Sequence, residues 1–528
     1  MRVVLCTAAS VLAATHLPFA APFTVLPPSH RSSVAGASRS ARSAAAASAT
    51  DAEAFKAWLA KAGVKGGECL LEIGQSSLDG GRGLMTTAPL KAGQAAVTVP
   101  ATLCITADKV VKGALSSHLK GYDGCLGDTG LIALQLLYEQ QQGSKSAIAA
   151  WLSLLPAQGT LDMPLFWPEK DLAVADGSST RGFSGLRADV IEDHAWLAQN
   201  MFTTATSPIP KDAFTEDAFV WAVGCVISRA FFVDGALHLV PLIDFANHGD
   251  VDDDSDNADA DAAAPLPETA AQESCGLGVF GGKGVRLVAG REYRPGEEFL
   301  ISYGPKGAAT YLEEHGFLPK GDGGGGVVGS EIELGLKAEA EDRFRDDKED
   351  ILETQDLPFN LSFDLYPSGL PDQAMVQYAR LVMLGGMDAF LLEAVFRTDI
   401  WGFMEEPVSA ANELAANNYI IGICQAQLDS FTSSAEEDEK LLASGGEGLS
   451  KRHQLCAQLR SAERAALQHT VNFFLTDNTA LDRKEYYQAR RLRDLNLDRP
   501  LDESEIFEPG SASNGMPRGR DAQRELDW

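Results

Sequence analysis

Residues 240–250, VPLIDFANHGD, place an apolar run directly before a group of polar side chains. The run from Val240 to Ile243 predicts a buried strand, because short apolar runs with β-branched residues favour strands. Asp244, Asn247 and His248 follow where that strand would end. Such a group can ligate a metal, supply a general base, cap a turn or hold a small molecule. These eleven residues alone do not identify which of the four roles applies, so the rest of the chain has to be considered.

Length and charge set the first limits. With 528 residues the chain is too long for one ordinary core, and we expect about two to four domains. An apolar content of 45% and a charged content of 22% are typical of globular proteins. The formal net charge of −30 argues against a nucleic-acid binder, which needs a basic surface to replace phosphate counterions. It suits solubility or a partner protein with basic residues.

The first fifty residues differ in composition from the rest. They contain arginines but no lysine and no acidic residue, and the first carboxylate is Asp51. An apolar stretch over 3–14 is too short to span a membrane, and a segment rich in Ser, Ala and Arg follows it. This order predicts a signal-like and transit-like targeting leader over 1–50 that directs the chain to a plastid, the chloroplast stroma. A secretory signal and a cytoplasmic location are the alternatives. No later segment is apolar enough to predict a membrane helix.

Two features suggest a bound metal, and neither has the required ligands. The eight cysteines contain no CxxC pair, so we expect reduced cysteines scattered through the core and no zinc cluster. Seven aspartates lie in an acidic segment over 249–274. A calcium loop that began at Asp252 would need Gly and Glu where the chain has Asn257 and Ala263. We therefore expect a solvated loop there and no metal.

Turn and strand signals divide the first part of the chain. APLKAGQAAVTVP (88–100) and REYRPGEEFLISYG (291–304) each place a glycine-centred turn beside an apolar strand. They predict β-rich pieces over about 67–106 and 235–304. Between them, 107–220 is predicted to be helical, as the apolar spacing of 130–141 illustrates. The expected fold class is therefore α+β, with a small β domain split by a helical insert.

Helical patterns dominate the part of the chain after the glycine-rich segment at 321–326. Ser433 and Glu436 fit a capping box that opens a helix over 433–442, and 460–475 has a second helical pattern. We expect an all-α domain over 335–495 and a flexible tail over 496–528.

Several stretches together resemble the SET-domain protein methyltransferases, in the Rubisco large-subunit lysine methyltransferase-like group. They are DGGRGLMTT (79–87), WLSLLP (151–156), LFWPEKDL (165–172), WAVGCVISRAF (221–231), VPLIDFANH (240–248) and ISYGPKGAATYLEEHGFLP (301–319). LDSFTSSAEEDEKLL (428–442) and LRSAERAAL (459–467) resemble the helical substrate-binding domain of that group. The resemblance covers roughly 55–490, and it implies a SET domain over 55–318 that contains the insert, followed by a Rubisco-LSMT-type substrate-binding domain.

The resemblance implies an S-adenosyl-L-methionine-dependent protein N-methyltransferase. The expected acceptor is a lysine side chain of a plastid protein, such as the Rubisco large subunit or another plastid enzyme. A lysine amine, whose ordinary pKa is about 10.4, must lose its proton before it attacks the methyl group. The protein then has to bind, align and desolvate the reactants. We expect a monomer with a protein substrate and neither nucleic acid nor membrane as a partner.

The same resemblance implies which residues form the site. Tyr303 is the expected catalytic residue, because the family uses this tyrosine to orient the target nitrogen. The residues expected to bind the cofactor are Gly81, Arg82, Gly83, Leu84, Arg229, Asn247, His248 and Phe317. The residues expected to face the substrate are Arg229, Asp244, Tyr303 and His315.

The chain departs from the family pattern at several of these positions. His315-Gly316-Phe317 stands where the family commonly has Tyr-Gly-Phe, and Gly307-Ala308 stands where it commonly has Ser-Asn. Gly80, Arg82 and Val233 also differ from the usual residues. These differences can alter the choice of substrate, the methylation state that is reached, or the activity itself.

Three other functions stay open on the sequence. One is a protein-histidine N-methyltransferase, because members of this group methylate either acceptor. Another is a catalytically weak SET-like adaptor that binds a partner through its helical domain. The third is a non-haem iron oxygenase, in which His248, Asp250 and His315 would form the metal triad.

Overall fold

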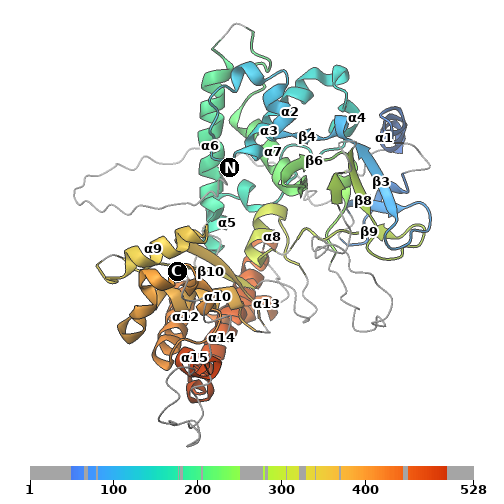
Figure 1. The fold of residues 1–528 in the computed structure, drawn as a ribbon. Helices are drawn as coiled ribbons and strands as arrows, with labels where there is room; N and C mark the ends of the chain where they lie inside the picture. The colour runs from blue at the N-terminus through green and yellow to red at the C-terminus, as the bar shows by residue number, and fades with distance from the viewer. Residues whose placement is uncertain are drawn as a thin grey trace, which may run out of the picture. The chain divides into compact units, whose positions relative to one another are not determined.

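The structure is a computed structural model, and it divides the chain into two compact units (Figure 1). Unit 1 comprises Met1–Asp322 and Asp438–Leu459, and unit 2 comprises Gly323–Glu437 and Arg460–Trp528. The residues that the structure describes are 49–64, 69–78, 81–175, 178, 182–203, 206–249, 277–279, 284–304, 306–319, 329–338, 340–367, 370–443 and 450–495. Most of the predicted leader, the acidic segment, the glycine-rich segment and the tail, with Gly80 and Asp250, lie outside the described residues.

Three small antiparallel sheets form the β part of unit 1. The first has the order β1 (Leu71–Gln75), β2 (Arg82–Thr86), β9 (Glu298–Phe299). The second has the order β3 (Ala95–Pro100), β8 (Gly284–Val288), β7 (Leu277–Val279). The third has the order β4 (Ile105–Thr106), β6 (Ala236–Leu239), β5 (Ala230–Val233). Each sheet joins strands from before and after the helical insert, so the predicted split β domain is confirmed.

Two glycine turns begin or end strands as the sequence predicted. Gly93 has φ +77° and Gly296 has φ +81°, a region that side chains with a Cβ rarely adopt. The amide of Gly93 donates to the carbonyl of Ala289 at 2.8 Å, and that of Gly296 donates to the carbonyl of Thr86 at 2.7 Å. These turns therefore bring the segment after the insert back onto the segment before it.

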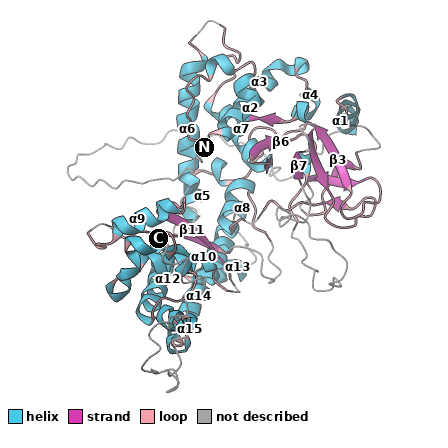
Figure 2. Ribbon diagram, viewed as in Figure 1, coloured by secondary structure: helices cyan, strands magenta, loops and turns pink. Residues whose placement is uncertain are grey.

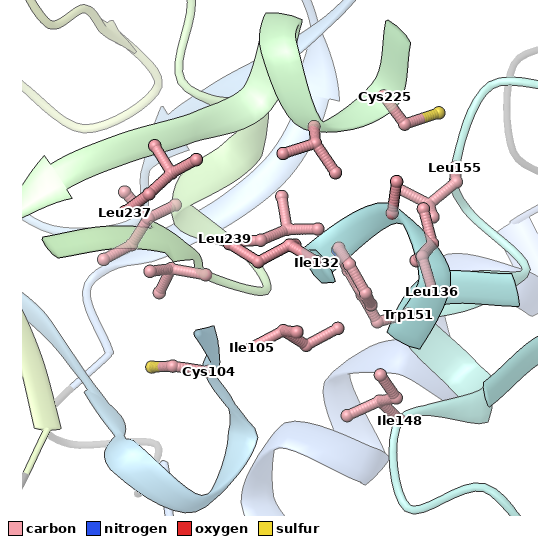
Figure 3. Close-up of a cluster of buried hydrophobic side chains, with 14 of the residues drawn as sticks. Cys104, Ile105, Ile132, Leu136, Ile148, Trp151, Leu155, Cys225, Leu237 and Leu239 are labelled. Carbon is pink, nitrogen blue, oxygen red and sulfur yellow. The ribbon is translucent and has the colours of Figure 1, made fainter. Parts of the chain in front are cut away.

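The insert packs its helices against the third sheet. The helices of unit 1 are α1 (Ala49–Lys61), α2 (Ala107–Lys112), α3 (Asp128–Gln142), α4 (Ala149–Leu152), α5 (Glu169–Leu172), α6 (Gly182–Met201), α7 (Glu216–Arg229) and α8 (Ala308–His315). In Figure 3, Ile132 of α3, Trp151 of α4 and Cys225 of α7 gather with Leu237 and Leu239 of β6. This core fixes the end of α7 and the end of β6, which both lead into the site.

A buried aspartate ties α6 to the loop that precedes α3. Asp193 is 1% exposed. Its carboxylate accepts hydrogen bonds from the Tyr122 hydroxyl at 2.7 Å, the Cys125 amide at 2.7 Å and the Leu126 amide at 3.0 Å. These three hydrogen bonds satisfy the buried carboxylate and hold the loop against α6.

The predicted strand over 240–243 is wrong, although its burial is right. Strand β6 ends at Leu239, and a 3₁₀ helix, η6, covers Ile243–Phe245. Pro241 has no amide hydrogen to donate to a sheet, and Leu242 has φ +77°, which turns the chain. Val240 and Ile243 are nonetheless fully buried. The apolar run is thus a buried turn that carries Asp244, not a strand.

Over its described residues, unit 2 is mostly helical, but it also contains a two-stranded sheet that the prediction of an all-α domain over 335–495 did not include (Figure 2). Strands β10 (Ser330–Gly335) and β11 (Asn360–Leu365) pair antiparallel. The helices of this C-terminal region are α9 (Arg345–Thr354), α10 (Gln373–Val382), α11 (Ile400–Phe403), α12 (Ala410–Ser430), α13 (Ala435–Ala443), α14 (Lys451–Asn478) and α15 (Tyr487–Asp494). By the unit boundaries, α13 and α14 each belong partly to unit 1.

The capping box of α13 lies one residue later than predicted. The amide of Glu437 donates to the Ser434 hydroxyl at 3.2 Å, and the amide of Ser434 donates to the Glu437 carboxylate at 2.8 Å. Because α13 starts at Ala435, Ser434 is the N-cap residue and Glu437 is the third helical residue. Ser433 and Glu436 have the same spacing, but each lies one residue before the N-cap and third helical positions of α13.

The sequence also predicted cysteines scattered through the core and no membrane-spanning helix after the leader. Of the six cysteines in the described ranges, Cys104, Cys225, Cys424 and Cys456 are buried, whereas Cys125 is exposed. Within the same ranges, no single helix has the length and apolarity to cross a membrane. One bent pair, Gln373–Val382 with Gly386–Leu392, meets both criteria together.

Asp193→Ala removes a carboxylate that three donors require. We expect the variant to lose about 3 kcal/mol of unfolding free energy, because two partly buried amides and a hydroxyl lose their acceptor. Urea titration followed by circular dichroism measures this loss. Asp189→Ala on the same helix is the control, since burial and repulsion from Asp193 and Glu192 raise the pKa of Asp189. A larger loss in the control than in Asp193→Ala would contradict the assignment.

Candidate active site

A buried ion pair stands at the base of the site. Arg229, the last residue of α7, donates through Nη1 to both the main-chain carbonyl and the Oδ2 atom of Asp244, each at 3.0 Å. Trp151 Nε1 donates to Asp244 Oδ1 at 3.1 Å. The side chain of Asp244 is 0% exposed. Burial raises the pKa of Asp244, while the Arg229 charge and the two hydrogen bonds oppose that rise.

Arg229 has one further donor available. In the described part of the chain, its Nε atom is buried and has no hydrogen-bond partner. The side chain as a whole is 17% exposed. A guanidinium in this setting suits an additional acceptor with a negative charge, because a buried unpaired N–H is costly.

Two guanidinium groups face the ring of Phe245. The Arg82 Cζ atom lies 5.1 Å from the ring centroid, and the Arg229 Cζ atom lies 5.2 Å from it. Both distances fit cation–π attraction. Burial lowers the pKa of Arg82, and the neighbouring charge of Arg229 lowers it further. The site therefore concentrates positive charge between β2 and the segment after α7.

The predicted cofactor loop and Asn247 are in direct contact. Asn247 Nδ2 donates to the carbonyl of Arg82 at 3.0 Å and to Oε1 of Glu298 at 2.9 Å. Gly83 lies beside this bond, and a Cβ at that position would come within 2.2 Å of Glu298 Oε1. Leu84, the next residue of β2, is fully buried. Only glycine at position 83 leaves the space that these contacts occupy.

Five rings form a cluster next to the loop. His248, Tyr303, Tyr311, His315 and Phe317 have neighbouring ring centroids between 4.5 Å and 6.4 Å apart. The Tyr303 hydroxyl donates to the carbonyl of Ala246 at 2.8 Å. The Tyr303 amide donates to Nδ1 of His248 at 3.3 Å. These bonds fix the Tyr303 ring at one end of an aromatic enclosure.

His315 is an uncharged member of the cluster. Its side chain is 8% exposed. Burial lowers the pKa of His315 to about 3, and the neighbouring side chains of Lys306 and His248 act in the same direction. Lys306 Nζ lies 3.4 Å from His315 Nε2, and it also pairs with Glu314. The ammonium donates to the neutral ring nitrogen, so His315 can serve as an acceptor at neutral pH.

The predicted site residues are connected to one another through contacts of this kind. Gly81, which accepts a hydrogen bond from the Ser76 amide at 2.8 Å, leads into β2. Arg82 contacts Asn247 and Phe245, Phe245 contacts Arg229, and Arg229 contacts Asp244. His248, adjacent to Asn247, contacts Tyr303 and Phe317, and Tyr303 contacts His315.

Sequence reasoning missed several residues of this region, among them Glu298 and Tyr311. Glu298 lies in the short strand β9 and holds Asn247. Tyr311 precedes His315 by one helical turn of α8, and its hydroxyl donates to the carbonyl of Gly304 at 2.8 Å. The spacing of Tyr311 and His315 was a usable signal, since residues four apart share a helix face. The role of Glu298 has no local sequence signal, because its partners lie far away along the chain.

The metal hypothesis finds no ligand set in the structure. Over the described ranges, no group of three His, Cys, Asp or Glu side chains is placed to hold a metal ion. Asp250, the third member of the proposed iron triad, lies outside those ranges.

Comparison with known proteins agrees with this geometry. Residues 339–467 match the family described as Rubisco LSMT substrate-binding. The chain is 30% identical to the chloroplastic fructose-bisphosphate aldolase-lysine N-methyltransferase of Arabidopsis thaliana, over 84% of this chain and 87% of that protein. The chain belongs to the SET-domain protein methyltransferases, in the Rubisco large-subunit methyltransferase-like group. The resemblance seen in the sequence is thereby confirmed.

Other members of this SET-domain group extend the comparison. The chloroplastic Rubisco large-subunit N-methyltransferase of Nicotiana tabacum is 28% identical over 84% of this chain and 86% of that protein. The actin-histidine N-methyltransferase of Danio rerio is 24% identical over 75% of this chain and 63% of that protein. The plastid lysine enzymes are thus more similar to this chain than this histidine enzyme is.

Solved structures of the group share the fold. The SET domain of LSMT bound to lysine and AdoHcy superposes with a TM-score of 0.65 at 25% identity, covering 85% of this chain and 96% of that one. Rubisco LSMT bound to AdoMet gives a TM-score of 0.64 at 25% identity, covering 86% of this chain and 98% of that one. The α+β fold class, with a β-rich SET domain and a helical C-terminal region, is confirmed.

His315→Phe should flatten the pH dependence of stability. The pKa of His315 is about 3 in the folded chain and about 6.5 when unfolded. The unfolded chain therefore binds the proton first as pH falls. The stability contribution of the neutral ring is fully present above about pH 6.5 and is lost progressively below it. From about pH 6.5 to about pH 4.5, the wild type should lose about 1.4 kcal/mol per pH unit more than the variant.

Urea titrations of both proteins across that range measure the two slopes. Parallel slopes would mean that the ring of His315 titrates normally in the folded protein.

Proposed function

We propose that this chain transfers a methyl group from S-adenosyl-L-methionine to lysine side chains of a plastid protein. The observation that carries the proposal is the position of Tyr303, whose hydroxyl is held by the Ala246 carbonyl inside the ring cluster. Asn247, the residue after Ala246, contacts the cofactor loop through the Arg82 carbonyl. Family membership supports the same enzyme class, protein-lysine N-methyltransferase.

The residues of the site fit the chemistry of this cofactor. The unpartnered Nε atom of Arg229 suits the carboxylate of the methionine part. Gly81, Arg82, Gly83 and Leu84 offer main-chain groups along β2, and Gly83 leaves room for close approach. Asn247, His248 and Phe317 would hold the amino and adenine parts. When bound, the cofactor supplies the electrophilic methyl group.

Tyr303 is the residue we assign to catalysis. Its hydroxyl and the Ala246 carbonyl are polar groups inside an otherwise aromatic enclosure. They orient the attacking nitrogen and the methyl group through hydrogen bonds and weak C–H···O contacts. The surrounding rings would shield a bound amine from part of the solvent, and burial favours the neutral form of an amine. The enclosure therefore helps the acceptor lysine lose its proton.

Substrate-facing roles follow from the same contacts. His315 lies beside Tyr303 as a neutral ring, and its Nε2 atom accepts from Lys306. Arg229 acts at the edge of the cofactor region. Asp244 is fully buried, so we assign it to holding Arg229 in place.

The partner is a protein substrate. A plastid enzyme with an exposed lysine, such as the Rubisco large subunit, is the candidate, because the relatives named for aldolase and Rubisco are chloroplastic. We assign 335–495 to substrate binding, consistent with the family match over 339–467. Residues 1–50 would direct the chain to the stroma, where it would act as a monomer without nucleic acid or membrane.

Three measurements test the proposal. Calorimetric titration with S-adenosyl-L-methionine separates an enzyme from an adaptor, and no binding at high micromolar cofactor would favour the adaptor. Mass spectrometry of plastid extract incubated with labelled cofactor identifies the acceptor. Label on histidine instead of lysine would reassign the reaction to the histidine enzymes of the group. A chelator should leave activity unchanged, in contrast to an iron oxygenase.

Tyr303→Phe and Asn247→Ala should affect different kinetic parameters. Loss of the Tyr303 hydroxyl should lower kcat about 100-fold or more with little change in cofactor affinity, because the hydroxyl aligns the reacting groups. Loss of the Asn247 amide should weaken cofactor binding about tenfold. Methylation kinetics of the identified substrate and calorimetry of the cofactor measure the two effects. Equal, small effects of both variants would contradict the assigned roles.

A further inference from the structure

Glu298 holds a buried carboxylate at the point where several parts of the site meet. The residue is 8% exposed. Its Oε2 atom accepts hydrogen bonds from the Ser76 hydroxyl at 3.1 Å, the Ser77 amide at 3.0 Å and the Ser77 hydroxyl at 3.1 Å. Its Oε1 atom accepts from Asn247 Nδ2 at 2.9 Å. All four donors are uncharged N–H or O–H groups, and together they use both carboxylate oxygens.

The carboxylate determines which way the Asn247 amide points. The two acceptors of Asn247 Nδ2 are the Glu298 carboxylate and the Arg82 carbonyl, and neither of these can donate. A flipped amide would place Oδ1 against two oxygen atoms. The nitrogen must therefore face Glu298 and Arg82, which leaves Oδ1 directed away from them as an acceptor for an N–H donor.

Gly83 and the segment before Tyr303 both lie next to the hydrogen bond between Asn247 and Glu298. A Cβ at position 83 would lie 2.2 Å from Glu298 Oε1 and 3.0 Å from Asn247 Nδ2. The Ile301 amide donates to the Asn247 carbonyl at 3.0 Å, three residues after Glu298. Glu298 thus links the loop after β1, the cofactor strand β2 and the segment that leads to Tyr303.

We propose that Glu298 is a positioning residue for cofactor binding, which acts by holding the Asn247 amide with Oδ1 toward the ligand. This inference rests on the proposed function, because the ligand is S-adenosyl-L-methionine. Glu298 itself does not touch the ligand in this assignment. It acts through Asn247, and the space at Gly83 is required for it to do so.

Glu298→Gln is the central test, because it keeps the shape and removes one acceptor. The glutamine amide must face either Asn247 or the Ser76–Ser77 loop. The hydroxyls of that loop can rotate to accept, but the Ser77 amide and Asn247 Nδ2 can only donate. We expect the dissociation constant for S-adenosyl-L-methionine, measured by calorimetry on the full chain, to rise about tenfold, the equivalent of one net hydrogen bond.

Two controls separate positioning from general stability. Glu297→Gln changes the adjacent carboxylate, which pairs with Arg291 and is 35% exposed, and should bind the cofactor like the wild type. Val97→Ala opens a cavity in the second sheet, since Val97 is fully buried. It should lower the melting temperature and leave the dissociation constant within about twofold of the wild type.

Gly83→Ala is a second variant that should disrupt the hydrogen bond between Asn247 and Glu298. It should also raise the dissociation constant for the cofactor about tenfold. In the double variant with Glu298→Gln, the dissociation constant should be at most about twofold higher than in the more affected single variant. Additive losses would show that the two residues act separately.

The outcomes distinguish this inference from the proposed function. A wild-type chain that binds the cofactor, together with Glu298→Gln binding equally well, overturns the inference and leaves the function standing. The inference is also overturned if Glu298→Gln and Val97→Ala lower the melting temperature equally and weaken cofactor binding equally, because the role of Glu298 is then structural. A wild-type chain that does not bind the cofactor overturns both.

Discussion

The site depends on one buried carboxylate, Asp244, that the fold can tolerate only with its oxygens bonded. A lone charge in that position would cost several kcal/mol, and losing one partner of a buried pair typically costs about 3–5 kcal/mol. Arg229 and Trp151 supply the partners from α7 and α4. The end of α7, the turn at η6 and the helical insert are therefore held in one arrangement. That arrangement sets the direction of the chain as it reaches Asn247 and His248.

Electrostatics separates the site into two parts. Around Phe245, the two guanidinium groups make a positive region that suits an anionic group of a ligand. Around Tyr303, the rings and the uncharged His315 make a region of low polarity. A cofactor carboxylate and a neutral amine need these two environments respectively, so the division matches the chemistry of methyl transfer.

Much of the secondary structure follows from local patterns. The turns at Gly93 and Gly296 need a residue that accepts positive φ, and that requirement is visible in the sequence. The helices over 130–141 and 460–475 follow from apolar spacing and lie within α3 and α14. The strand predicted over 240–243 failed, because burial and β-branched residues do not distinguish a strand from a buried turn.

By itself, the sequence determined the family, the order of the β and helical parts, and the set of candidate site residues. These depend on motifs and periodicities that lie within short stretches of chain. The tertiary structure alone decided the partners: Asp244 for Arg229, Glu298 for Asn247 and the ring of His315 for Tyr303. Such pairs join residues distant in sequence, and their distances and burial exist only once the chain has folded. For the same reason, the low pKa of His315 and the free donor of Arg229 have no counterpart in the sequence.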